Sequence, residues 1–222
     1  EMLRDCARFP ALVAALLEGG VAPRLIDLAG HPSFELSTEA FATLRELLLV
    51  HKEVAVRHVM SEFEAFFGLF HSSLLAAETD YVVKRQALRL LADVLLDRTF
   101  CEVMVQYVAD ERFLQIHMNA LRDSSRSIQL GGFHIFKIFV ANPSKPRKVH
   151  SILHRNKDGL LKMLSTFSAE AAQDEILHQD LMAVERVLRG LEAPSKRNNV
   201  IKCSETVLAR SVDPRQSSGN GL

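Results

Sequence analysis

Paired histidines are the residues of this sequence whose spacing comes closest to a metal site. His150 and His154 are four residues apart, so a helix would place both imidazoles on one face. The sequence lacks the intervening Glu of a metalloprotease helix and offers no third ligand nearby. A solvated or partly packed pair is therefore the preferred interpretation, and we expect neither a metal nor a cofactor.

Catalytic motifs are missing from the rest of the chain. There is no dinucleotide-binding G-x-G-x-x-G, no phosphate-binding P-loop, no G-x-S-x-G and no EF-hand loop. The Gly131-Gly132 pair lies inside a helical pattern, where it favours close helix packing over phosphate binding. We therefore expect that the protein is not an enzyme.

A cluster of basic residues offers a second kind of chemistry. Arg85 and Arg89 are four residues apart, and Tyr81 precedes Arg85 by four, so all three share one face of a predicted helix; Arg98 follows shortly after. Arg and Tyr are enriched where proteins bind other proteins. Two interpretations stay open at this point: a solvated helix face, or a surface that binds a partner.

Three strongly periodic helices must position these residues. They are predicted over Ser37–His51, with Ser37 as the N-cap, over Asp80–Asp97 and over Ser125–Ala141. The apolar stripe of each begins with a small residue and continues with large ones; the small residues are Ala40, Ala87 and Gly132. These lie 47 and 45 residues apart, a period typical of armadillo and HEAT repeats. Chance alignment of three helices in another all-α domain is the alternative.

Shorter helices fill the intervals between the periodic ones. They are predicted over Val54–Met60, Ser61–Leu75, Phe100–Ala109, Glu111–Leu121, Lys145–Asn156 and Lys157–Phe167, and one long helix over Ala169–Leu191. No strand pattern occurs, and Gly (10) and Pro (7) are too few for an all-β protein. The fold class is therefore all-α, an armadillo/HEAT-like helical repeat superhelix or α-solenoid. Residues 1–192 are assigned to the array and residues 193–222 to a disordered, mildly basic tail.

Charge and apolar runs narrow the classes of protein further. Lys and Arg total 27, as do Asp and Glu, so the basic excess of a nucleic-acid binder is missing. No apolar run approaches the roughly 18 residues of a membrane-spanning helix. The three cysteines, Cys6, Cys101 and Cys203, are far apart, which argues against a zinc site or a disulfide framework. We expect a cytoplasmic protein without membrane, metal or nucleic-acid partners.

Four segments carry a resemblance to a known family. They are MLRDC (2–6), FELSTEAFATLRELLL (34–49), YVVKRQALRLLADVLLDR (81–98) and MNALRDSSRSIQLGGFHIFKIFVANPSK (118–145). In this order and spacing they resemble the mouse protein 25 family, also called calcium-binding protein 39, from the first residue to about Leu191. The resemblance implies an armadillo-like horseshoe, of which this chain is the C-terminal part.

The same resemblance implies a function. Members of the family are non-catalytic scaffolds that bind germinal-centre-type kinases and the pseudokinase STRAD and hold the kinase fold in its active form. With STRAD they activate liver kinase B one, and relatives serve kinase networks of polarity and cytokinesis. The concave, kinase-facing surface of the family matches Phe34, Tyr81 and Arg85 here, and Arg89 lies one turn further on.

A second family surface is a pocket that accepts a Trp-Glu-Phe tail of the pseudokinase. Its methionine matches Met118, and its basic residues correspond to Arg155 and Arg98. Methionine adapts to aromatic rings, and a cation suits a peptide carboxylate. Two basic positions of the family fall on Gln115 and Gly159 in this chain, which reduces the positive charge of the pocket.

Two functional hypotheses therefore stand side by side. The first is a scaffold that binds and allosterically activates a protein kinase or pseudokinase. The alternative is a helical-repeat protein that binds nucleic acid through Arg85, Arg89, Arg98 and the basic tail, against which the zero net charge argues.

Overall fold

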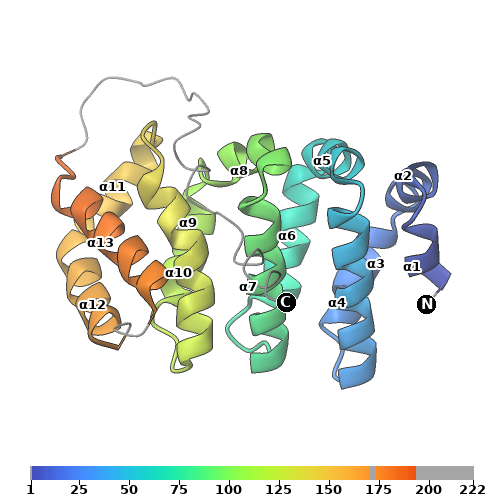
Figure 1. Ribbon diagram of the computed structural model, residues 1–222, viewed down its shortest axis with the longest axis horizontal. Helices are drawn as coiled ribbons and strands as arrows, with labels where there is room; N and C mark the ends of the chain where they lie inside the picture. Colours follow the sequence, from blue (N-terminus) through green and yellow to red (C-terminus); the bar gives the residue numbers. More distant parts are fainter. Residues whose placement is uncertain (1, 171–173, 194–222) are drawn as a thin grey trace, which may run out of the picture.

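The computed structural model describes residues 2–170 and 174–193, which form α-helices and one short 3-10 helix, with no strand in these ranges (Figure 1). The predicted all-α helical repeat fold is confirmed. In chain order the elements are α1 (Met2–Cys6), α2 (Pro10–Glu18), α3 (Val21–Ala29), α4 (Phe34–Leu49), α5 (Lys52–Ser61), α6 (Phe63–Leu74), α7 (Tyr81–Leu95), η1 (Arg98–Phe100), α8 (Cys101–Tyr107), α9 (Glu111–Ala120), α10 (Arg126–Ala141), α11 (Arg147–Arg155), α12 (Lys157–Glu170) and α13 (Glu175–Arg189).

Repeats of three helices account for this order. The third helices of successive repeats, α4, α7, α10 and α13, begin 47, 45 and 49 residues apart. Figure 1 shows α4, α7 and α10 as a row along the longest axis, and each of the four contacts the next in the row. Each repeat buries its apolar face against its neighbours, so the core runs through the array as one continuous cluster.

Small residues allow the close helix contacts that the sequence pattern predicts. Ala40, Ala87 and Gly132 are all buried. A Cβ atom placed on Gly132 would lie 2.7 Å from the Cβ of Ala120 on α9, so only glycine fits at this α9–α10 contact. A Cβ on Gly131 would lie 3.1 Å from the Cβ of Leu88, so α10 also approaches α7 closely, though less closely than it approaches α9.

The beginning of α4 differs from the prediction. Ser33, not Ser37, is the N-cap residue, so α4 starts one turn earlier than expected. The Ser37 side chain is buried and its hydroxyl donates a hydrogen bond of 2.6 Å to the carbonyl of Ala29. Ser37 therefore fastens α4 to the end of α3 instead of capping its own helix.

The long helix predicted over Ala169–Leu191 is wrong. The structure contains α12 up to Glu170 and a separate α13 from Glu175, which packs back on α12 and α10. The Asp174 carboxylate accepts a hydrogen bond of 2.9 Å from the backbone N–H of Leu177 and so begins a new helix. The predicted tail lies outside the described residues from position 194 on. None of the described helices has the length and apolar character that crossing a membrane would require.

Candidate partner-binding surfaces

Two equivalent helices present exposed aromatic residues at their first positions. Phe34 begins α4 and Tyr81 begins α7, and their exposed fractions are 68% and 43%. Neither side chain belongs to the buried core. Because α4 and α7 are equivalent helices in contact, both aromatics belong to one surface.

Arginines extend this surface along α7. Arg85 and Arg89 are exposed one and two turns after Tyr81, and neither forms a hydrogen bond or ion pair with another described residue. A hydrogen bond with Ser127 lowers the pKa of Tyr81, and the positive charge of Arg85 acts in the same direction. We refer to Phe34, Tyr81, Arg85 and Arg89 as the α4–α7 face.

Elsewhere in the row, charged residues neutralise each other. Arg45 on α4 pairs with Asp93 on α7, and the ammonium of Lys137 on α10 lies 2.5 Å from a carboxylate oxygen of Asp180 on α13. Arg85 and Arg89 have no such acidic neighbour among the described residues. The α4–α7 face therefore combines exposed aromatic rings with unpaired positive charge, which suits a protein partner that carries carboxylates.

An open groove of about 510 Å³ lies between α9 and α11. Met118, predicted for the tail pocket, lines it and is only 6% exposed. The groove, named here the Met118 groove, is lined by Gln115, Met118, Asn119, Arg122, Ile152, Arg155 and Asn156. The structure thus brings together Met118 and Arg155, which lie 37 residues apart, and places Gln115 beside them.

Arg98 does not join them. It lies exposed on η1, between α7 and α8, and is not among the residues that line the groove. Its predicted part in partner binding stays a prediction. Gly159 is exposed on α12 and likewise does not line the groove.

Arg122 is the cation that sequence reasoning missed. It follows Met118 by four residues at the C-terminal end of α9, so helical spacing alone could have identified it. Neither Arg122 nor Arg155 forms an ion pair with a described acidic residue. Arg155 makes only a long contact of 3.4 Å with the Ser151 carbonyl. The groove therefore joins a methionine and an isoleucine to two available guanidinium groups.

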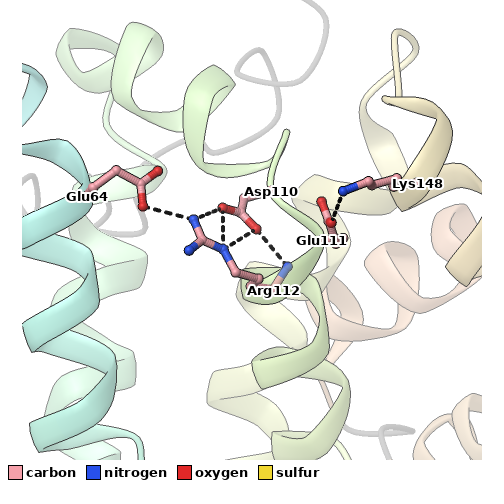
Figure 2. Close-up of polar contacts among 5 residues, drawn as sticks. All are labelled: Glu64, Asp110, Glu111, Arg112 and Lys148. Carbon is pink, nitrogen blue, oxygen red and sulfur yellow. Dashed lines mark hydrogen bonds and ion pairs between the residues drawn. The ribbon is translucent and has the colours of Figure 1, made fainter.

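Ion pairs at the start of α9 join it to α6 and to α11, as Figure 2 shows. Lys148 on α11 donates to Glu111 on α9 at 2.6 Å, and this hydrogen bond lowers the pKa of the Glu111 carboxyl. The Asp110 carboxylate caps α9 and binds the side chain of Arg112, whose Nη2 also lies 2.9 Å from Glu64 on α6. The chain of contacts sets α9 against both α6 and α11.

The histidine pair of α11 takes part in no metal cluster. Within residues 2–170 and 174–193, no three His, Cys, Asp or Glu side chains gather so that they could hold a metal ion. The Nε2 atom of His150 lies 2.9 Å from the carbonyl oxygen of Glu192. A carbonyl oxygen only accepts hydrogen bonds, so the imidazole donates its Nε2–H. His150 therefore has a structural partner near the end of the array.

Comparison with known proteins decides the family. The family described as Mo25-like matches residues 1–192. The chain belongs to the Mo25-like family. Mo25 is the short form of mouse protein 25, so the resemblance drawn from the sequence is confirmed.

Individual relatives agree with this assignment. The degreening-related gene dee76 protein of Auxenochlorella protothecoides is 36% identical over 187 residues, which cover 84% of this chain and 58% of the relative. The Mo25-like protein of Schizosaccharomyces pombe is 38% identical over 175 residues, 79% of this chain and 53% of the relative. Human calcium-binding protein 39-like is 35% identical over 174 residues, 78% of this chain and 51% of the relative. The chain thus spans about half the length of the curated relatives it matches.

Proposed function

We propose that this Mo25-like chain is a non-catalytic, cytoplasmic scaffold that binds protein kinases or pseudokinases and activates them allosterically. The observation that carries the proposal is the Met118 groove, where an apolar floor lies beside two unpaired guanidinium groups. The family resemblance implies a pocket for an aromatic and acidic pseudokinase tail at the same place. The polarity and cytokinesis networks served by relatives are the proposed setting.

The chemistry of the groove suits such a tail. Arg122 and Arg155 can form charge-assisted hydrogen bonds with the Glu side chain or the terminal carboxylate of a Trp-Glu-Phe segment. Met118 and Ile152 supply the apolar contact for its rings. Gln115 stands where the family has a cation, and Arg122, just after the end of α9, supplies another cation to the groove.

The α4–α7 face is the proposed contact for the kinase domain itself. Exposed aromatic side chains, and arginines without an ion pair among the described residues, are typical anchors of protein interfaces. A scaffold activates a kinase only if it binds the active conformation more tightly than the inactive one. Contact at two separate surfaces lets the rigid helical array favour the one kinase conformation that reaches both.

Co-purification of a STRAD-like pseudokinase tests the proposal. We expect Arg85→Ala combined with Met118→Ala to abolish its retention while the circular dichroism spectrum stays helical. The matched control is Arg57→Ala, an exposed arginine of α5 outside both surfaces, which should retain the partner as the wild type does. Undiminished retention by the double variant would reject both surface assignments.

A further inference from the structure

A second cavity, of about 270 Å³, opens on a neighbouring face of α9. Its apolar walls come from Leu88 on α7, Ile116 on α9 and Ile128 on α10, together with Leu75 after α6. We name it the Leu88 cleft. No part of the α4–α7 face lines it, and neither Met118 nor Arg155 does.

The Leu88 cleft adjoins the Met118 groove. Asn119 is exposed on α9 and lines both cavities. Along α9, Gln115 and Met118 face the groove, whereas Ile116 faces the cleft, so the two cavities occupy neighbouring faces of one helix. A bound chain can pass from one to the other by crossing Asn119.

Charge distinguishes the two cavities. The charged groups at the rim of the cleft already have partners, since the ammonium of Lys84 donates to the Ala77 carbonyl at 2.6 Å and Asp123 accepts from the backbone N–H of Ser125 at 2.8 Å. Their opposite charges also leave the rim without net charge. The cleft therefore suits an uncharged apolar group, whereas the groove suits an acidic one, because its two arginines form no ion pair with a described residue.

Size limits what the cleft can hold. Its volume lies just below the range of roughly 300–1,000 Å³ that is usual for pockets of complete small molecules. One aliphatic or aromatic side chain is a better match. Because α9 is about 10 Å across and an extended chain advances about 3.3 Å per residue, three or four residues span from groove to cleft.

We propose that the Leu88 cleft is a second subsite for the acidic peptide of the Met118 groove, and that it takes one apolar side chain four residues before the aromatic and acidic core. The proposal rests on the proposed function of the groove. The peptide specificity of this chain then depends on two cavities separated by Asn119. The Met118 groove selects the acidic group, and the Leu88 cleft selects the apolar side chain.

Two synthetic peptides test the second subsite on the full chain with labelled Leu, Ile and Met methyl groups. One is acetyl-Leu-Ser-Ser-Ser-Trp-Glu-Phe, and the other carries Ser in place of Leu. We expect both to shift the Met118 methyl resonance in nuclear magnetic resonance spectra. Only the Leu peptide should shift Leu88, Ile116 and Ile128, and it should bind about fivefold more tightly or better.

A bulky side chain placed inside or outside the cleft gives a matched pair of variants. Ala77 is exposed and lines the cleft but not the groove. Ala77→Phe should therefore remove the advantage of the Leu peptide and leave the affinity of the Ser peptide unchanged. Ala65→Phe, at an exposed position of α6 outside both cavities, should keep the advantage.

The outcomes separate the cleft from the groove. Equal affinities of the two peptides, or an advantage that survives Ala77→Phe, would overturn the second subsite while the groove stands. If neither peptide shifts Met118, the groove assignment fails. The cleft is then judged on the Leu peptide alone: shifts of Leu88, Ile116 and Ile128 support it, and their absence rejects it.

Discussion

Two buried histidines share one tyrosine hydroxyl in the core. The Tyr107 oxygen lies 2.9 Å from Nε2 of His71 on α6 and 2.7 Å from Nε2 of His117 on α9. A hydroxyl has a single proton, so it donates to the unprotonated Nε2 of one imidazole, which must be neutral, and accepts from the Nε2–H of the other. Burial lowers the pKa of His71 to about 4 and that of His117 to about 3.

Stability should fall as the pH decreases through the unfolded-state pKa of these histidines, near 6.5. Below that pH these histidines bind protons in the unfolded chain but stay unprotonated in the folded chain. The free energy of unfolding therefore drops by about 1.4 kcal/mol per pH unit for each histidine. We expect a loss of about 2 kcal/mol between pH 7 and pH 5.5 in urea denaturation. Because the pKa values of His58 and His134 are also lowered, His117→Gln should remove only the share of one histidine, about 1 kcal/mol over this pH range, and an unchanged slope would contradict the assignment of a neutral His117.

Removal of the shared hydroxyl should be costly. Tyr107→Phe leaves both Nε2 atoms without their partner in a dry site, which costs about 1–3 kcal/mol of unfolding free energy in urea denaturation. Tyr81→Phe removes a hydroxyl from an exposed side chain and should change stability by less than about 0.5 kcal/mol. Equal effects of the two substitutions would show that Tyr107 is not held as described.

The residues of the candidate site differ in how well their roles could be predicted from the sequence. Met118 and Arg155 were predicted only through the family resemblance, because no periodicity connects positions on α9 and α11. Arg122 shares the face of Met118 and could have been predicted from spacing. The contacts of Tyr107 with His71 and His117 depend on how α6, α8 and α9 pack, which a pattern within single helices does not contain.

At the scale of helices, apolar periodicity predicted most of the array. The helices α4, α7 and α10 were located within a few residues, because their stripes are long and regular. The division between α12 and α13 was predicted near position 168, several residues too early, because Asp174 reads as an ordinary helix-face charge, although it caps α13. Its capping role becomes visible only when α13 folds back on α12 and α10.

The α9–α10 contact predicts opposite effects of one substitution at two glycines. Gly132→Ala forces a Cβ to within 2.7 Å of the Cβ of Ala120 and should destabilise the fold by about 1–3 kcal/mol. Gly68→Ala on α6 meets no atom within 4 Å and should stabilise it by about 0.5–1 kcal/mol through helix propensity. Thermal unfolding of the two variants measures both effects. A stabilised Gly132→Ala variant would contradict the close contact.

At the scale of the whole molecule, the balanced charge argues against nucleic acid as a partner. The 27 basic and 27 acidic residues leave no net attraction for phosphates. Basic side chains of α4 and α10 are also paired with carboxylates of α7 and α13. We expect fluorescence anisotropy with a random single-stranded RNA at 50 mM salt to show only weak binding, without the steep salt dependence of phosphate contacts. Tight binding that weakens steeply with salt would favour the nucleic-acid alternative.

The array as a whole determines how the two surfaces cooperate. The α4–α7 face and the Met118 groove lie on different repeats of one continuous core. A partner that binds one surface is held near the other at a high effective concentration, which raises its overall affinity. Each surface on its own should bind its part of the partner weakly.

Isothermal titration of the chain with a STRAD-like pseudokinase, with and without its C-terminal tail, tests this account most directly. Met118→Ala should weaken binding of the intact pseudokinase at least tenfold and leave binding of the tail-less form unchanged, whereas Arg85→Ala should weaken both. If Met118→Ala weakens the tail-less form as much as the intact one, or if the wild-type chain binds neither form, the scaffold with two separate binding surfaces is contradicted.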